Sequence, residues 1–454
     1  MKNIYCLVVM IMATLLNAQD YNRKLDNFLA SEIGKLNIPN VDIAVISCND
    51  VVYSKSIGEK QSDDALYYIG SVSKSLTALG ILKLVDSGKL DVEQTLSEII
   101  PTIQYNDDSR QITIRHLLNH TSGISKRSGF RDLPNLNALE NANFSLTISR
   151  KPGKIHEYSN LNYALLGLVI EQISGVAYSD FMASNVFQPL HMNSSVIYPH
   201  RQENDRIIEQ YQYWGGFPVN SKQVDYATTA VPAGFILSNT GDLSNYLSMM
   251  LSNGQFNAEP FIDPRLISEM LTPWDKSGYG YAMGWKKGAY HGKTTFQHLG
   301  STATSYAAIF IIPEKNIGFS ILTNTNSLIF TEKLTEGILN ILTDGTAGPV
   351  SDTEFYLRIG VLVGILFFTI NLLIKIIKEL RNTESLDIKK MYLSSFINIG
   401  IFILFAVIFP YITDVPLLTF LKLQPDIGTL ILLYFLSPLI LNTVRVIHQY
   451  ASGK

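Results

Sequence analysis

Three long apolar runs near the carboxyl end form the strongest pattern in the chain. They cover about residues 355–377, 391–413 and 427–447, and the interior of each run is free of charged residues. A helix needs about 20 consecutive apolar residues to cross a bilayer. We therefore expect three transmembrane helices, preceded by a linker over residues 346–354 that contains Gly348, Pro349 and several small or acidic residues.

A shorter apolar run begins the chain. Lys2 precedes the apolar stretch Ile4–Leu16, and the small residue Ala18 follows it. A basic residue, an apolar stretch and a small-residue boundary are typical of a secretory signal peptide, and the stretch is too short to span a bilayer. We expect residues 1–18 to be a signal peptide that is cleaved after Ala18.

The pattern over residues 19–345 changes from strands to helices and back to strands. Short alternating or apolar segments predict the strands, and segments of period 3.6 predict the helices. The predicted strands are Val41–Ser47, Val51–Ile57, Ser305–Ile312 and Ile317–Thr323, and the predicted helices include Tyr21–Leu36, Val72–Asp86, Leu161–Ile173 and Thr331–Leu342. Strands at both ends imply an α+β domain, with one sheet built from both ends and a helical insertion.

Charge divides the chain in the same way. The net charge of −3 combines a tail over residues 355–454, with nine Lys or Arg against five Asp or Glu, and a body over residues 19–354 at −8. The end of the first apolar run and the connection after it hold five basic residues (Lys375, Lys378, Arg381, Lys389 and Lys390), whereas the next connection holds only Lys422. The positive-inside rule makes the first connection cytoplasmic. We therefore expect a multi-pass protein of the cell membrane whose 19–345 domain is periplasmic or extracellular.

Composition argues against several classes of function. A mildly acidic chain without a basic stripe is not expected to bind nucleic acid. Cys6 and Cys48 are too few for a disulfide framework or a cysteine zinc site. His116 and His120 lie four residues apart, but no glutamate follows the first as in a metalloprotease helix. We expect no metal and no cofactor. The aromatic residues of the segment 211–217 are expected to form a loop at the edge of a pocket.

The first candidate for chemistry is Ser71-Val72-Ser73-Lys74, where a loop enters a predicted helix. Three residues make nearly one helical turn, so the Ser71 hydroxyl and the Lys74 amine share a face. A serine becomes nucleophilic when a neighbouring base takes its proton, and a lysine of lowered pKa can be that base. The spacing alone is weak evidence, because about two such pairs are expected by chance in a chain this long.

Two further motifs follow along the chain. In Tyr158-Ser159-Asn160, the tyrosine offers a second base and Asn160 can bind a substrate amide or ester, although a turn with a helix cap fits the same residues. In His298-Leu299-Gly300-Ser301, Gly300 allows close backbone approach and the Ser301 amide can join that of Ser71 around an oxyanion. Spacing alone does not separate this motif from the sequences around Gly153 and Gly288, but its position just before the predicted strand Ser305–Ile312 favours His298.

Together, Ser-x-x-Lys, Tyr-x-Asn and His-x-Gly resemble the motifs of the serine β-lactamase and penicillin-binding protein superfamily. The similarity is to the branch that contains class C β-lactamases, D-amino peptidases and related esterases. Five segments carry it in the family's order, beginning at Tyr67, Ile112, Pro152, Pro232 and His298. The resemblance covers roughly residues 20–343 and implies the β-lactamase/transpeptidase-like fold, in which the sheet is antiparallel.

The resemblance also implies a role for each matched residue. Ser71 would be the acylated nucleophile, Lys74 and Tyr158 the base and proton-relay pair, and Asn160 a substrate-orienting residue. His298, Gly300 and Ser301 would bind substrate, with the Ser71 and Ser301 amides as the oxyanion hole. His298 stands where many members have lysine, and Leu299 where carboxylate-binding members often have threonine. Both departures weaken a grip on a free substrate carboxylate.

The expected function is that of a membrane-anchored serine hydrolase acting outside the cytoplasmic membrane through an acyl-enzyme on Ser71. Its substrate would be a small molecule or peptide with an ester or amide bond, and its other partner the lipid bilayer. One alternative is a D,D-carboxypeptidase, endopeptidase or β-lactamase acting on cell-wall peptides or β-lactams. Another is a penicillin-binding-like sensor that is acylated without turnover.

Overall fold

The computed structural model describes residues 21–35, 37–58, 64–106, 111–130, 145–198, 205–222, 226, 228–274, 280–327, 330–344, 353–381, 388–413 and 417–451. The predicted signal peptide and all but the last two residues of the predicted linker lie outside these ranges. Contacts divide the chain into two compact units. Unit 1 holds the chain up to residue 211 together with residues 220–351, and unit 2 holds residues 212–219 and 352–454.

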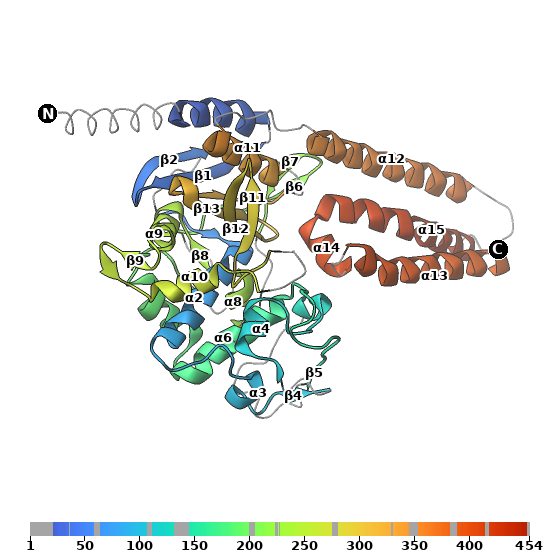
Figure 1. Ribbon diagram of the computed structural model, residues 1–454. Coiled ribbons are helices and arrows are strands. Elements are labelled where there is room, and N and C mark those ends of the chain that lie inside the picture. The colour runs from blue at the N-terminus through green and yellow to red at the C-terminus, as the bar shows by residue number, and fades with distance from the viewer. Residues whose placement is uncertain are drawn as a thin grey trace. The chain divides into compact units, whose positions relative to one another are not determined.

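A six-stranded antiparallel sheet forms the centre of unit 1 (Figure 1). Strand β14 lies between β13 and β1, and Ile321 is opposite Ala308 on one side and Ile43 on the other. The sheet therefore joins segments from both ends of the domain, as predicted. Its order is β11 (Lys286–Tyr290), β12 (Lys293–Ser301), β13 (Tyr306–Ile312), β14 (Ile317–Thr323), β1 (Asn40–Ser47) and β2 (Asp50–Gly58).

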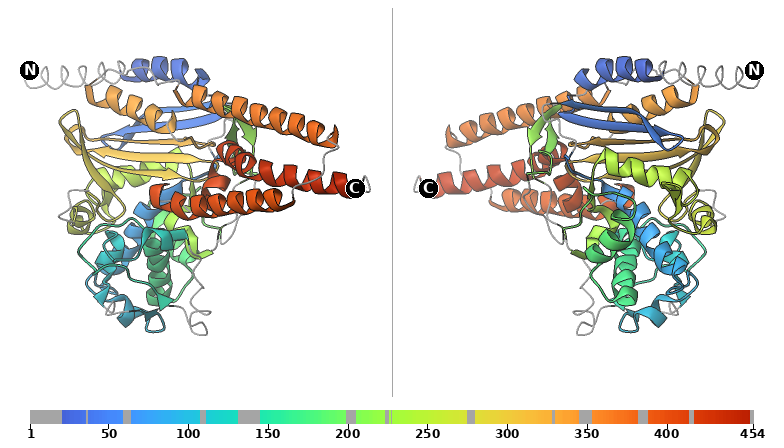
Figure 2. Two further views of the ribbon diagram at one scale, coloured as in Figure 1. Left: turned by 90° about the vertical axis from the view of Figure 1, so that its right-hand side faces the viewer. Right: turned by 90° about the vertical axis from the view of Figure 1, so that its left-hand side faces the viewer.

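Helices cover both faces of this sheet (Figure 2). The helix over residues 21–35 and α11 (Phe330–Asp344) lie on one face, and α9 (Thr240–Leu251) packs against β1 and β14 on the other. The first two helices are in contact, since a side chain at Gly337 would come within 2.1 Å of the Phe28 ring. The two ends of the domain are thus packed together.

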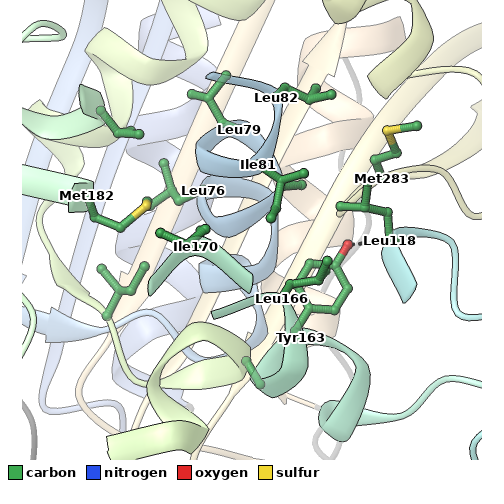
Figure 3. Close-up of a cluster of buried hydrophobic side chains, with 14 of the residues drawn as sticks. Leu76, Leu79, Ile81, Leu82, Leu118, Tyr163, Leu166, Ile170, Met182 and Met283 are labelled. Atoms are coloured by element: carbon green, nitrogen blue, oxygen red, sulfur yellow. Dashed lines mark hydrogen bonds between the residues drawn. The ribbon is translucent and has the colours of Figure 1, made fainter. Parts of the chain in front are cut away.

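The helical part of unit 1 is built around α2 (Ser73–Asp86). This helix is buried on nearly all sides, as expected for a helix inside a protein core. Figure 3 shows Leu76 and Ile81 of α2 among side chains that include Ile170 of α6 (Asn160–Ser174) and Met182. Packing is close enough that a side chain at Gly80 would lie 2.7 Å from the Met182 sulfur. The first turn of α2 is therefore held firmly in place.

Shorter elements complete unit 1. They are β3 (Tyr67–Tyr68), η1 (Gly70–Val72), α3 (Leu96–Ile99), β4 (Gln104–Tyr105), α4 (Ile114–Leu118), η3 (Lys126–Phe130), β5 (Ser145–Leu146), α7 (Tyr178–Met182), η4 (Ala183–Phe187), η5 (Thr228–Ala230), α8 (Val231–Gly234), β8 (Leu237–Ser238), β9 (Gln255–Phe256), β10 (Glu259–Pro260), α10 (Pro264–Met270) and η6 (Pro313–Lys315).

Unit 2 is mainly helical. Its helices are α12 (Thr353–Arg381), α13 (Ile388–Thr413), α14 (Leu417–Leu423) and α15 (Pro425–Ala451). Three helical stretches, Tyr356–Arg381, Met391–Thr413 and Pro425–His448, are long and apolar enough to cross a membrane. They contain the three predicted runs, whereas α14 was not predicted.

A β-hairpin belongs to the helical unit. It consists of β6 (Tyr211–Trp214) and β7 (Phe217–Asn220), and residues 212–219 are grouped with the helices rather than with unit 1. The expectation of a loop was therefore wrong, because the segment forms two paired strands. Gly215 and Gly216 connect the strands with φ angles of +57° and +88°, as a two-residue hairpin turn requires.

Candidate active site

Ser71 lies in η1, directly before the first turn of α2, as the sequence predicted. The Lys74 Nζ atom is 3.0 Å from the Ser71 Oγ atom, which is hydrogen-bonding distance. Ser71 is partly exposed, whereas Lys74 is fully buried. A substrate can therefore reach the hydroxyl, while the amine behind it is shielded from water.

The surroundings of Lys74 contain a carbonyl and aromatic rings. Nζ donates a hydrogen bond to the Ala233 carbonyl oxygen and lies 4.9 Å from the centre of the Tyr158 ring. Burial lowers the pKa of Lys74 well below its usual value, because the charged amine loses its hydration. The neutral amine is thereby favoured, and a neutral amine can accept the proton of the Ser71 hydroxyl.

Tyr158 lies across from Lys74, at the turn before α6. Burial raises the pKa of its hydroxyl, and a hydrogen bond with Ser71 opposes that effect. His120 supports this turn, because its Nδ1 atom accepts a hydrogen bond from the Ser159 backbone N–H at 3.2 Å. The rings of His120 and Tyr158 are 4.3 Å apart. His120 thus helps to hold the tyrosine beside the serine.

Asn160 is the first residue of α6 and shares this turn. Its side-chain oxygen Oδ1 is buried and has no hydrogen-bond partner in the described part of the chain. An unmatched buried acceptor is costly, and a substrate N–H would satisfy it. The geometry is compatible with the expectation that Asn160 binds a substrate amide.

The end of β12 closely approaches η1. A side chain at Gly300 would lie 2.0 Å from the Ile69 carbonyl oxygen and 2.9 Å from the Ser71 nitrogen. A side chain at Gly70, which has a φ of +52°, would lie 2.5 Å from the Ser301 nitrogen. Only glycine fits at both positions. The Ser71 and Ser301 amide groups are therefore near each other, as an oxyanion hole requires.

His298 lies on β12 itself, although the sequence analysis placed this motif before the next strand rather than within one. The ring is 6% exposed, and its centre is 6.5 Å from that of Tyr158. Burial and the neighbouring Lys74 lower the pKa of His298 to about 3. The imidazole is therefore neutral at physiological pH and provides no cation for a substrate carboxylate.

Hydrogen bonds assign the tautomer of His298. Its Nδ1 atom is 2.8 Å from the Leu299 carbonyl oxygen, which can only accept, so Nδ1 carries the proton. Its Nε2 atom then accepts from the Tyr281 hydroxyl at 3.2 Å. Tyr281 is buried between His298 and the ring of His156. Sequence reasoning did not single out Tyr281, because this residue lies in none of the three motifs.

The structure brings all seven predicted residues into one region. Ser71, Lys74 and Tyr158 are in direct contact, and Gly300 and Ser301 adjoin Ser71. His298 is near Lys74, and Asn160 shares the turn with Tyr158. The roles of these residues remain predictions.

Comparison with known proteins identifies the family. Residues 23–338 match the family described as Beta-lactamase. The chain belongs to the beta-lactamase family. Members of this family are serine hydrolases that include β-lactamases, carboxypeptidases and amidohydrolases. The predicted β-lactamase/transpeptidase-like fold is confirmed.

Several relatives of this beta-lactamase family chain are known. Protein flp of Staphylococcus aureus (strain MRSA252) is 27% identical over 322 residues, covering 68% of this chain and 64% of that protein. Penicillin-binding protein 4* of Bacillus subtilis (strain 168) is 32% identical over 216 residues, covering 44% and 47%. The octameric penicillin-binding protein homologue from Pyrococcus abyssi has a similar structure, with a TM-score of 0.60, 26% identity, and 73% and 78% of the chains covered. The match thus spans just under two thirds of the first relative and about half of the second.

Proposed function

We propose that this chain is a membrane-anchored serine hydrolase that cleaves an ester or amide through an acyl-enzyme on Ser71, outside the cytoplasmic membrane. The observation that carries the proposal is the contact between a buried amine of lowered pKa, Lys74, and the accessible Ser71 hydroxyl at 3.0 Å. Unit 2 would provide the anchor through its three long apolar helices.

The acylation step uses groups that already lie together. The neutral Lys74 amine takes the proton from Ser71 as Oγ forms a bond to the substrate carbonyl carbon. The negative charge on the carbonyl oxygen is stabilised by the Ser71 and Ser301 amides. Tyr158, which keeps its proton because its pKa is raised, passes a proton to the leaving group while Lys74 restores it. The leaving alcohol or amine departs, and Ser71 carries the acyl group.

Deacylation returns the enzyme to its starting state. A water molecule gives a proton to the same base pair and adds its oxygen to the acyl carbon. The bond to Ser71 Oγ breaks, the serine regains its proton, and the carboxylic acid leaves. An intact Lys74–Tyr158 pair supports turnover over the alternative of a sensor that remains acylated.

The third motif favours substrates that have no free carboxylate in the part of the molecule that this motif would bind. His298 is neutral and already bonded on both ring nitrogens, and Leu299 has no hydroxyl to donate. An ester or an uncharged amide avoids the cost of burying an unpaired carboxylate. A D,D-peptidase or β-lactamase activity is the second candidate. It is favoured by the unmatched Asn160 oxygen, which suits an amide N–H, and by the names of the relatives.

Active-site labelling tests the proposal directly. A fluorophosphonate probe should label the full-length protein, and Ser71→Ala should abolish the labelling. Ser87→Ala is the matched control, since Ser87 caps the opposite end of α2 and should leave labelling unchanged. Labelling that persists in the Ser71 variant would refute the assignment. Rates on a short neutral ester, a D-alanyl peptide and a chromogenic cephalosporin would separate the two candidates.

A further inference from the structure

Two ion pairs join α12 to α15 in unit 2. Arg358 pairs with Asp426 at 3.0 Å, and both side chains are 1% exposed. Arg445 pairs with Glu379 near the other end of the same helices. At 1.5 Å rise per residue, the helix between Arg358 and Glu379 is about 31 Å long and that between Asp426 and Arg445 about 28 Å. Both lengths match the hydrocarbon core of a bilayer, about 30 Å.

The β6–β7 hairpin covers the first of these ion pairs. The Arg358 guanidinium lies 5.1 Å from the centre of the Tyr213 ring, and the Gly215 backbone N–H donates to Asp426 Oδ2 at 3.2 Å. Gln212 Nε2 donates to the Lys422 carbonyl oxygen at 2.8 Å. A charge pair is tolerated away from water only when its remaining hydrogen-bonding groups are satisfied. The hairpin therefore completes the polar cluster at this end of the helices.

The turn of the hairpin extends beyond that ion pair along α12. A side chain at Gly215 would lie 2.9 Å from the Cβ atom of Leu362. Leu362 is one helical turn further into the apolar stretch than Arg358, or about 6 Å along the axis. The glycine turn thus reaches the level at which the apolar surface of α12 begins.

The opposite face of the hairpin is apolar and exposed. Successive strand residues point to opposite sides, so Tyr213 faces Arg358 while Trp214 faces away. Trp214 is 40% exposed, Phe217 52% and Val219 46%. The segment from residue 212 to 219 contains no charged residue. The long helices of the same unit are also apolar and widely exposed.

We propose that the hairpin Gln212–Val219 is a lipid-contacting element, and that its Trp214, Phe217 and Val219 face enters the phospholipid interface at the Arg358–Asp426 end of the helices. The proposal rests on the proposed membrane anchoring. Tryptophan is enriched in this region of a bilayer, where its apolar ring and its polar N–H are both accommodated. The hairpin lies within the sequence of the hydrolase domain. In this proposal the domain is therefore linked to lipid through the hairpin segment as well as through the anchor helices.

Bromolipid quenching tests the contact on the full-length chain. The protein is reconstituted into phosphatidylcholine vesicles with or without phosphatidylcholine brominated at carbons 6 and 7, which quenches tryptophans within the membrane. The chain has three tryptophans. We expect bromolipid to reduce the emission, and Trp214→Phe to remove at least half of the bromine-dependent decrease.

Trp274→Phe is the matched control, because Trp274 is 41% exposed but lies in unit 1. It should retain the decrease. Quenching that is absent from the unaltered chain, or equally large in the Trp214 variant, would overturn the proposal. Hydrolysis of a short soluble ester by each variant shows that the domain is folded. Extraction with alkaline carbonate separates the two hypotheses: release from the vesicles contradicts the anchor itself, whereas a retained but unquenched protein contradicts only the hairpin contact.

Discussion

The Lys74 amine lies 3.0 Å from the Ser71 hydroxyl, and Lys74 is fully buried whereas Ser71 is partly exposed. This relationship links the fold to the chemistry. Dense packing around α2 holds the amine in a place where hydration is lost, and the lost hydration favours the unprotonated form that can act as a base. The same packing directs the amine at the nucleophile.

The pH dependence of hydrolysis should reveal which group is the base. If neutral Lys74 is required, kcat/KM for a neutral ester falls as pH decreases through its pKa, and this acid limb lies well below the usual lysine value of 10.5. A Tyr158 phenolate would instead require strongly alkaline pH, since burial raises the pKa of that group. A limb at or above pH 10 would contradict the lysine assignment. Lys74→Ala should lower kcat/KM by roughly 10³-fold or more and remove the limb.

Gly300→Ala should disrupt the oxyanion hole more than the rest of the domain. The added methyl group would lie 2.0 Å from the Ile69 carbonyl oxygen, so β12 and η1 must separate. Loss of one oxyanion donor costs about 10²–10³ in kcat. Gly34→Ala is the control, since nothing lies within 4 Å and the helical site should gain about 0.5–1 kcal/mol. Equal kcat values for both variants would show that the close approach has no catalytic role.

Selectivity between neutral and anionic substrates should depend on His298 and its partner Tyr281. His298→Lys introduces a cation where the imidazole is neutral, and should raise kcat/KM for an ester with a free carboxylate, relative to its neutral analogue, by about tenfold. Tyr281→Phe removes the hydrogen bond to Nε2 and should shift the same ratio less and in the same direction. The measurement is the ratio for the matched substrate pair. An unchanged ratio in the lysine variant would mean that this motif does not determine substrate charge.

The Arg358–Asp426 pair should show strong coupling. Either Arg358→Leu or Asp426→Leu leaves a buried charge without its partner, and should destabilise unit 2 by about 3–5 kcal/mol. The double variant should recover most of that loss, because no charge remains to be buried. Thermal melts of the detergent-solubilised full chain, of both single variants and of the double variant measure this double-mutant cycle. The partly exposed Arg445–Glu379 pair is the comparison, and its loss should have a smaller effect on stability. Additive losses of stability in the Arg358 and Asp426 variants would contradict the coupling.

Patterns within short stretches of sequence predicted the strands and helix ends that are determined by neighbouring residues. The continuous apolar segments of β13 and β14 are strands because they are buried on both faces, and α6 ends where Gly175 adopts a φ of +74°. The motif residues of the site were also found, because their spacing is short or their family order is specific. Apolar segments, glycine positions and motif spacing can all be read from the sequence alone.

Other features depend on partners far along the chain. β12 mixes polar and apolar residues, and only its place between β11 and β13 makes it a strand. The partner of Tyr281 is a histidine 17 positions away in no shared motif. The hairpin at Gly215 is bound to Asp426, 211 positions later, so its sequence alone resembled a loop beside a pocket. Such contacts depend on how the chain folds, which a pattern of apolar and polar residues along the sequence does not record.

The position of β14 in the sheet has a consequence for how this protein folds. The strand between β13 and β1 is the last of the six to be synthesised, so the sheet has no complete centre until nearly the whole domain has been made. Contacts of such long sequence separation fold slowly, because the loop-closure entropy is lost before pairing compensates for it. α12 begins at Thr353, only a short distance after β14. Under the proposed membrane anchoring, completion of this sheet and insertion of α12 into the membrane would therefore compete in time, and a delay in strand pairing would leave edges of β1 and β13 open to aggregation.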